Sequence, residues 1–204
     1  MTTPNWKHWD KELVDLLYDL KINGFDLRGG TDKNSSHNYT GIYAHLLKKY
    51  QQKPGRLLEI GTCFGGSAYL WQNYLPDFFI DMIDINDRVP QELWDEMDDE
   101  RYDFYQGDAY TKEGLDLFGE NAYDVIIDDG PHSLASQTFS AAHYYALLKP
   151  GGIMIIEDIQ DPAHLEILSE CLSVGHKKGV EIFDVRETRG HRDDLIWTVT
   201  KPLD

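Results

Sequence analysis

Two short segments constrain the fold of this chain most strongly, because each joins an apolar run to a pair of acids. They are residues 125–129, Val-Ile-Ile-Asp-Asp, and residues 153–158, Ile-Met-Ile-Ile-Glu-Asp. An apolar run of this length is typical of a strand buried on both faces of a parallel sheet. Residues 136–148 have the length and composition of a crossover helix, which Lys-Pro-Gly-Gly at 149–152 is expected to end. The segment therefore predicts a β–α–β unit.

The acids that close these two strands should lie together. Parallel strands joined by a crossover helix finish at the same edge of the sheet, and open α/β sheets bind ligands at that edge. We therefore expect the carboxylates of Asp129, Glu157 and Asp158 to converge. Three carboxylates in one place repel one another unless a cation lies among them. The alternative is that Asp129 and Asp158 only cap helices.

The rest of the chain repeats the same alternation of strands and helices. A helix over residues 6–20, ended by Gly24, precedes the sheet, and the segment 187–194 is too short for a crossover helix, so the last two strands should be antiparallel. We predict an α/β fold: a Rossmann-like, doubly wound, seven-stranded sheet, mainly parallel with a C-terminal antiparallel hairpin. The other predicted strands are residues 56–60, 78–84, 102–105, 180–186 and 195–200; the other predicted helices lie around residues 42–47, 69–71, 91–97, 112–118 and 162–171.

Length and charge limit the class of protein. A chain of 204 residues fits one domain, with residues 1–40 as an N-terminal helix and covering loop and residues 41–204 as the core. The net charge of -17 argues against a nucleic acid or an anionic membrane as partner. Two cysteines and an N-terminus without a signal-peptide pattern indicate a cytoplasmic protein. The sequence leaves open whether the chain forms a homo-oligomer.

Several polar side chains are placed to bind a ligand at the sheet edge. Residues 61–67, Gly-Thr-Cys-Phe-Gly-Gly-Ser, turn a strand into a helix, where glycine lets backbone approach a ligand. The glycine spacing is not the dinucleotide fingerprint, and Glu59 would repel a pyrophosphate but could receive a cationic ligand. Asp84 ends its strand where acids hold ribose hydroxyls in nucleotide-binding folds, unless it is only a turn residue. Residues 29–39 form a polar loop that either binds a ligand or is solvated, with Asn38 or Thr40 as a helix cap.

These motifs together resemble the class I, Rossmann-like S-adenosylmethionine-dependent methyltransferases over about residues 40–204. The resemblance implies that Glu59 and residues 61–65 face the methionine part of the cofactor, that Asp84 binds the ribose and that Asp108 binds the adenine amino group. The motifs are Glu59-Ile60-Gly61 with Gly65, Asp84, Gly107-Asp108-Ala109, Leu-Lys-Pro-Gly-Gly at 148–152, and the closing hairpin. The full set assigned to the cofactor is Thr31, His37, Tyr39, Glu59, Gly61, Gly65, Ser67, Asp84, Asp108 and Asp128.

A narrower resemblance is to the metal-dependent sugar O-methyltransferases of the macrocin and mycinamicin type. It rests on Gly-Thr-Asp-Lys at 30–33 with His37, Tyr39 and Tyr43, on Asp-Asp-Gly-Pro-His at 128–132, and on Glu157-Asp158. It implies that Asp129, Glu157 and Asp158 bind Mg²⁺ and that His132 is the general base, with Asp129 also catalytic. The sequence departs from the family at Pro131, where serine is expected.

The chemistry agrees with that resemblance. A sulfonium methyl group is already activated, so the enzyme has to align a hydroxyl and remove its proton. A sugar hydroxyl is a weak acid, and Mg²⁺ can lower its pKa. We therefore expect O-methylation of a small-molecule acceptor, a sugar or glycoside with a vicinal diol. Two alternatives remain: a metal-independent methyltransferase with His132 as base, and a cofactor-binding or hydroxylase-like relative that transfers no methyl group. For His132 itself, the alternative is a helix-entry residue bonded to backbone.

Overall fold

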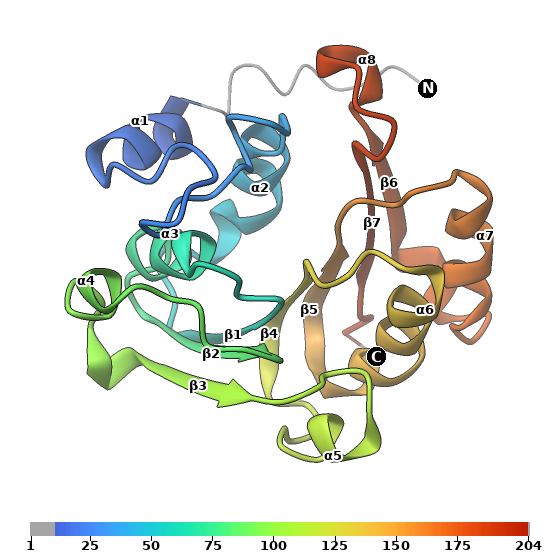
Figure 1. Cartoon of the computed structure of the whole chain (residues 1–204). Coiled ribbons are helices and arrows are strands. Elements are labelled where there is room, and N and C mark those ends of the chain that lie inside the picture. Colours follow the sequence, from blue (N-terminus) through green and yellow to red (C-terminus); the bar gives the residue numbers. More distant parts are fainter. Residues whose placement is uncertain (1–10, 204) are drawn as a thin grey trace.

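The computed structural model describes residues 11–203 and contains one seven-stranded sheet in the order β3-β2-β1-β4-β5-β7-β6 (Figure 1). The first five strands are parallel, and β7 runs antiparallel between β5 and β6. This confirms the predicted α/β fold with its antiparallel C-terminal hairpin. The strands are β1 (Gly55–Ile60), β2 (Phe78–Asp84), β3 (Tyr102–Gln106), β4 (Tyr123–Asp128), β5 (Leu148–Ile156), β6 (Val180–Asp184) and β7 (Leu195–Thr200).

Helices cover both faces of this sheet (Figure 1). Helices α1, α2 and α3 pack on one face, around a core that includes Leu17, Tyr43 and Trp71. Helices α6 and α7 lie on the other face, around Tyr144 and Trp197. The helices are α1 (Lys11–Asp19), α2 (Thr40–Leu47), α3 (Gly66–Tyr74), α4 (Gln91–Trp94), α5 (Lys112–Leu115), α6 (Leu134–His143), α7 (Ala163–Glu170) and α8 (Arg186–Arg189), with 3₁₀ turns at Lys48–Tyr50, Asp99–Arg101, Tyr144–Leu147 and His176–Gly179.

The parallel register fixes where the predicted acids stand. Ile60 of β1 pairs with Ile83 of β2 and with Asp128 of β4, and Asp128 pairs in turn with Ile156 of β5. The next residue of each strand therefore reaches the same edge of the sheet. The backbone N–H of the residue after β4, Asp129, still donates to the Ile60 carbonyl at 2.9 Å.

The predicted crossover helix differs from the observed one at both ends. Helix α6 starts two residues earlier, at Leu134, because the Ser133 side chain caps it. It ends at His143, a 3₁₀ turn follows, and β5 already begins at Leu148. Residues 149–152, which were expected to end the helix, are thus part of β5. The pairing of β4 with β5 shifts its register opposite this stretch, between Tyr123 and Val125.

Other predicted boundaries also moved. The part of the predicted helix 6–20 before Lys11 lies outside the described residues, and α1 ends at Asp19, followed by Lys21 with a left-handed φ of 59°, rather than at Gly24. Tyr39 occupies the N-cap of α2 without a side-chain cap bond, so neither Asn38 nor Thr40 acts as the cap. The helices predicted at 91–97 and 112–118 are single turns.

Within residues 11–203, no helix has the length and hydropathy needed to span a membrane.

The segment between α1 and α2 lies directly on the start of α3. Its backbone is tied back on itself, because Gly24 N–H donates to the Thr31 carbonyl at 3.0 Å. A Cβ atom added at Gly66, the first residue of α3, would lie 2.4 Å from the Gly30 carbonyl carbon and 2.5 Å from the Gly29 oxygen. Glycine at position 66 therefore lets this segment reach the sheet edge.

We expect Gly66→Ala to destabilise the protein by about 1–3 kcal/mol, the usual cost of forcing extra atoms into a packed site, although alanine favours helix more than glycine does. Urea unfolding measures the difference. Gly119→Ala is the matched control, because its added Cβ would meet only Ala122 at 3.9 Å. Equal stability of Gly66→Ala and wild type would contradict the observed contact.

Candidate active site

A cavity of about 800 Å³ opens at the carboxyl edge of the parallel strands. One part of its wall comes from the ends of β1, β2 and β3, with Gly61, Asp84 and Asp108. Another part comes from the residues that follow β4 and β5, including Asp129 and Asp158. The predicted cofactor side and the predicted metal side thus border one continuous space.

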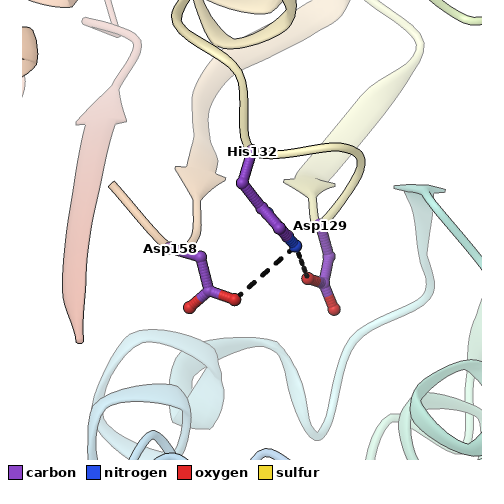
Figure 2. Close-up of side chains that lie close together, drawn as sticks. All are labelled: Asp129, His132 and Asp158. Carbon is purple, nitrogen blue, oxygen red and sulfur yellow. Dashed lines mark ion pairs between the residues drawn. The ribbon is translucent and has the colours of Figure 1, made fainter. Parts of the chain in front are cut away.

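Asp129, His132 and Asp158 lie close together in this cavity (Figure 2). The Nε2 atom of His132 is 3.9 Å from Asp129 Oδ1 and 3.7 Å from Asp158 Oδ2, and one ligand atom of each of the three residues lies within 4.8 Å of the others. Two carboxylates and an imidazole are side chains that bind divalent metal ions. The arrangement fits a single such ion.

Strained backbone places two of these side chains. His132 and Asp158 adopt φ angles of 55° and 53°, in the left-handed region that few residues other than glycine enter. Gln137 of α6 stabilises the turn after β5, because its side-chain amide donates to the carbonyl of Glu157 at 2.9 Å and of Asp158 at 3.3 Å. Backbone strain of this kind persists where surrounding structure enforces it, and it concentrates at functional sites.

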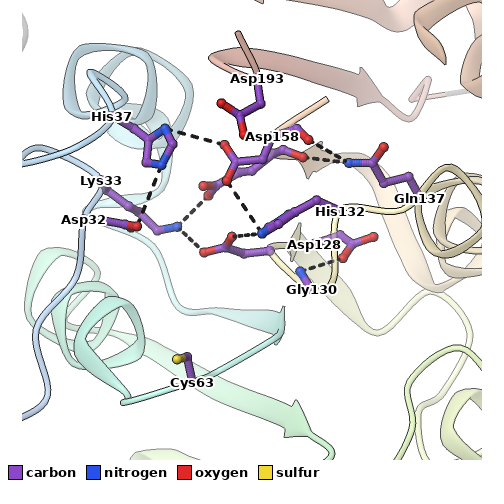
Figure 3. Close-up of polar contacts among 12 residues, drawn as sticks. Asp32, Lys33, His37, Cys63, Asp128, Gly130, His132, Gln137, Asp158 and Asp193 are labelled. Atoms are coloured by element: carbon purple, nitrogen blue, oxygen red, sulfur yellow. Dashed lines mark hydrogen bonds and ion pairs between the residues drawn. The ribbon is translucent and has the colours of Figure 1, made fainter. Parts of the chain in front are cut away.

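Glu157, the third predicted metal ligand, is buried and is not part of the cavity wall. Its side chain is 2% exposed, and its Oε1 atom accepts hydrogen bonds from Lys33 Nζ at 2.6 Å and from the Tyr43 hydroxyl. Lys33 also donates to Asp129 Oδ2 at 2.8 Å, and Figure 3 shows its side chain reaching toward the acids beside His132 and Asp158. The structure therefore brings Asp129 and Asp158 to the cavity and joins Glu157 to Asp129 through a buried lysine.

Lys33 is the member of this acid cluster to which the sequence analysis assigned no role. It belongs to the Gly-Thr-Asp-Lys motif at 30–33. The signal that could have identified it is the expectation that three converging carboxylates need a cation. A lysine in a polar loop, 96 positions from Asp129, gives no local sign that it supplies that charge.

Charge and burial perturb the whole cluster. Burial raises the pKa of Glu157 well above its usual value, and the charge of Asp129 adds to this, although Lys33 opposes both. The pKa of Asp158 is raised for the same two reasons. Burial alone would lower the pKa of Lys33, but Asp129 and Glu157 together raise it well above the usual value. Lys33 therefore carries its charge throughout the physiological pH range.

The loop residues assigned to the cofactor lie behind Asp158 rather than on the cavity wall. The Tyr39 hydroxyl donates to Asp158 Oδ1 at 2.5 Å. His37 Nδ1 is 2.6 Å from Oδ1 of the buried Asp194, and the charge of Asp158 helps to raise the pKa of His37 against the opposing effect of burial. Thr31 is buried, and its backbone N–H donates to the Ile22 carbonyl at 2.9 Å. Their assignment to the cofactor stays a prediction.

The residues on the β1 and β2 side vary in their access to the cavity. Asp84 and Asp108 line it, and Asp84 accepts hydrogen bonds from the backbone N–H groups of Cys63 at 2.9 Å and Asn86 at 3.0 Å. Gly61, with φ 89°, also lines it, but a Cβ there would lie 2.2 Å from the Asp129 carbonyl oxygen. Packing against β4 by itself therefore requires glycine at position 61.

The other assigned residues of this side are set back from the cavity. Asp128 is buried and accepts a hydrogen bond from the Tyr110 hydroxyl at 2.6 Å, so that it holds a tyrosine that lines the cavity. Gly65 takes the N-cap of α3 with φ 80°, and Ser67 is buried in the first turn of that helix. Their roles toward a cofactor also stay predictions.

The strand order, the antiparallel β7 and the cavity at the carboxyl edge define the class I, Rossmann-like methyltransferase fold, which confirms the fold expected from the sequence motifs. MycE methyltransferase from the mycinamycin biosynthetic pathway, solved in complex with Mg, SAH and mycinamycin VI, matches with a TM-score of 0.65 at 23% identity, over 98% of this chain and 54% of that one. At this identity the match establishes the fold.

The sequence is similar to O-methyltransferases named for mycinamicin VI and for a rhamnosyl tetracenomycin. It is 31% identical to mycinamicin VI 2''-O-methyltransferase of Micromonospora griseorubida over 60% of this chain and 32% of that enzyme. It is 28% identical to 8-demethyl-8-alpha-L-rhamnosyl tetracenomycin-C 2'-O-methyltransferase of Streptomyces olivaceus over 67% of this chain and 37% of that enzyme. The chain thus spans about a third of the length of these relatives. No protein-family model matches it.

Glu59 is fully buried near the end of β1, where it accepts a hydrogen bond from Trp71 Nε1 at 2.9 Å. Burial raises its pKa to about 7, against the opposing charge of Lys33 and the hydrogen bond from Trp71. The folded chain therefore keeps a proton that the unfolded chain releases near pH 4.5. Because the folded state binds more protons in this interval, its stability falls as the pH rises from about 4.5 to 7, and the loss is complete above that range.

We expect Glu59→Gln to be more stable than wild type at about pH 8, by up to roughly 3 kcal/mol, because glutamine has no charge to bury. The advantage should shrink at about pH 5, where Glu59 is protonated in the folded chain. Urea unfolding at the two pH values measures it. Glu113→Gln, on the exposed side of α5, serves as the control. A pH-independent difference for Glu59→Gln would show that its ionisation does not limit stability.

Proposed function

We propose that this chain is an S-adenosylmethionine-dependent O-methyltransferase that acts on a hydroxyl of a sugar or glycoside with a vicinal diol. The observation that carries this proposal is the single cavity that joins Asp84 and Asp108 at one part of the wall to Asp129, His132 and Asp158 at another. A methyltransferase needs these two halves in one space, because the methyl donor and the acceptor oxygen must be held in contact.

The β1 and β2 side of the cavity suits S-adenosylmethionine. An acid at the end of β2 can accept hydrogen bonds from ribose hydroxyls, and Asp84 is held in place by two backbone N–H groups. Asp108 lies at the end of β3, where we place the adenine amino group. The acidic wall also suits a cation, and when bound the cofactor supplies a methyl group that its sulfonium has already activated. Glu59 and residues 61–65 would lie nearest its methionine part.

We assign a Mg²⁺ ion to the carboxylates of Asp129, Glu157 and Asp158. Lys33 contacts only Oδ2 of Asp129 and Oε1 of Glu157, which leaves a second oxygen on each. Carboxylate oxygens are the ligands that Mg²⁺ prefers, and the ion would lower the pKa of an acceptor hydroxyl and hold a neighbouring one. Burial of the cluster would strengthen these electrostatic effects.

His132 is the proposed general base. Its imidazole lies on the cavity wall, 31% exposed, with Nε2 near both Asp129 and Asp158. The two carboxylates would stabilise the imidazolium that forms when the ring accepts the hydroxyl proton, and they fix its orientation. The strained backbone at this position aims the ring into the cavity, where a helix-entry residue would need no such placement.

The sugar acceptor is proposed by analogy with the relatives. Their names place the transferred methyl group on the 2'' oxygen of mycinamicin VI and on the 2' oxygen of a rhamnosyl tetracenomycin. The net charge of -17 supports a small-molecule acceptor over a nucleic acid or a membrane. Both cysteines are unpaired, which supports a reducing cytoplasm as the compartment.

One observation favours a second candidate, a metal-independent methyltransferase. Lys33 already supplies a positive charge among the acids, so part of their repulsion is relieved without a metal ion. In that case His132 and the two carboxylates beside it would act alone. The requirement for a divalent cation separates the two candidates.

The test is a methyl-transfer assay with S-adenosylmethionine and a panel of glycosides, read by mass, with Mg²⁺ or with EDTA. We expect a mass gain of one methyl group that EDTA and Asp129→Ala each abolish, while cofactor affinity measured by calorimetry stays within about threefold. Activity that survives both EDTA and Asp129→Ala would favour the metal-independent candidate. Absence of transfer to every glycoside would count against the sugar acceptor.

For the base, we expect His132→Asn to lower turnover by roughly 10²–10⁴ with little change in cofactor affinity. Asparagine tolerates the left-handed φ of this position better than alanine does, so the variant separates chemistry from backbone strain. His143→Asn, exposed at the end of α6, is the control. Near-normal turnover by a folded His132→Asn variant would place the base elsewhere.

A further inference from the structure

Lys33 is the buried cation of the acid cluster. Its side chain is 1% exposed, and its Nζ atom lies 2.8 Å from Asp129 Oδ2 and 2.6 Å from Glu157 Oε1. The same atom lies 5.5 Å from the centre of the Tyr43 ring. A buried ammonium is costly unless it is paired and hydrogen-bonded, and these contacts meet that condition.

The position of Lys33 matters because it shares carboxylates with the cavity. Asp129 is contacted from two sides: Oδ2 contacts the Lys33 ammonium, and Oδ1 faces the His132 ring at 3.9 Å. Glu157 is held at Oε1 by Lys33 and by Tyr43. Lys33 therefore fixes the rotation of both carboxylates, and with it the direction in which their second oxygens point.

The charges of the cluster balance around one further cation. Asp129, Glu157 and Asp158 carry three negative charges when ionised, and Lys33 neutralises one of them. One divalent ion would balance the other two. The nearby His37 Nδ1 lies 2.6 Å from Asp194 Oδ1 and 3.7 Å from Asp158 Oδ1, and the count assigns this ring to the nearer carboxylate.

We propose that Lys33 is a positioning residue that acts as a resident cation of the metal centre: it holds one oxygen of Asp129 and one of Glu157, and it limits the centre to a single divalent ion. This inference rests on the proposed function, because it assumes a cation at these carboxylates. Lys33 does not reach the cavity wall, so it acts through Asp129 and Glu157 and not on the acceptor.

The chain delivers Lys33 from the segment that lies on α3. Gly30, three residues before it, packs against Gly66, and the Lys33 carbonyl accepts a hydrogen bond from the Tyr39 N–H at 2.9 Å. The neighbouring Asp32 lines the cavity. The same segment thus borders the cavity and completes the charge of the acid cluster.

The experiment compares wild type with Lys33→Met, which keeps the length of the side chain and removes its charge. Thermal unfolding is measured without metal and with Mn²⁺ as the probe. Without metal, we expect the Tm of Lys33→Met to fall by about 10 °C, because the buried Glu157 and the half-buried Asp129 lose their counter-ion. Lys112→Met, whose exposed ion pair with Asp116 lies on α5, is the matched control and should behave as wild type.

The response to Mn²⁺ separates a resident cation from a merely structural lysine. If Lys33 and the metal share carboxylates, the ion should bind Lys33→Met at least tenfold more tightly, which adds about 3–5 °C to the rise in Tm that Mn²⁺ produces in wild type. A structural lysine would lower the Tm equally with and without Mn²⁺. An equal or smaller rise in the variant therefore overturns the proposal.

Two further results keep the outcome decisive. Titration of wild type should show one Mn²⁺ ion per chain, and a second tightly bound ion would contradict the charge limit. If Lys33→Met folds only when Mn²⁺ is present, the coupling between Lys33 and the metal ion is confirmed in its strongest form. If neither Lys33→Met nor the milder Lys33→Gln folds with or without Mn²⁺, the role of Lys33 is structural and the proposal is overturned. A wild-type chain that does not respond to Mn²⁺ overturns the metal centre itself, which is a different result from an uncoupled Lys33.

Discussion

The repulsion among acids at one edge of the sheet is the constraint on which the rest of the site depends. Parallel pairing of β1, β4 and β5 places Asp129, Glu157 and Asp158 within one cluster, and no rearrangement of side chains can separate strand ends that the register has joined. Burial makes the repulsion stronger, since little water screens it. Lys33 lies inside the cluster and relieves part of this repulsion. The loop before α2 is therefore part of the site.

Alternation along the strands decides which acid does what. Successive side chains of a strand point to opposite faces, which separates the carboxylates of Asp128 and Asp129. Asp128 turns to the face of α6 and holds Tyr110, whereas Asp129 turns toward Lys33. After β5 the chain leaves the strand, and the left-handed φ of Asp158 brings its carboxylate back toward the cavity. In each of the two pairs, 128–129 and 157–158, the first carboxylate is thus buried and the second lines the cavity.

Much of this fold could be predicted from the sequence, because buried parallel strands are continuous apolar runs that end in turn residues. The bounds of β2 and β7 agree with the prediction. The prediction was wrong at 149–152, where proline and glycine normally end an element but here lie within β5. Convergence of the acids also followed from topology. Lys33 did not, because its contact with Glu157 spans 124 positions and local periodicity carries no information about such a pairing.

Electrostatic attraction and repulsion also explain why the two halves of the cavity can share one acidic wall. A sulfonium cofactor and a divalent ion are both cations, so each is attracted by the carboxylates while they repel each other. Lys33 contacts two carboxylates from the protein side and neutralises one negative charge, which lowers the charge that a metal ion would otherwise have to balance alone. It does so without entering the cavity, because its ammonium approaches from the face of α2 and leaves the opposite oxygens free. In the proposed function, Lys33 lies on the protein side of the acids and the metal ion would lie on the cavity side, so that a compact acidic site would accept a cationic cofactor and a metal ion together.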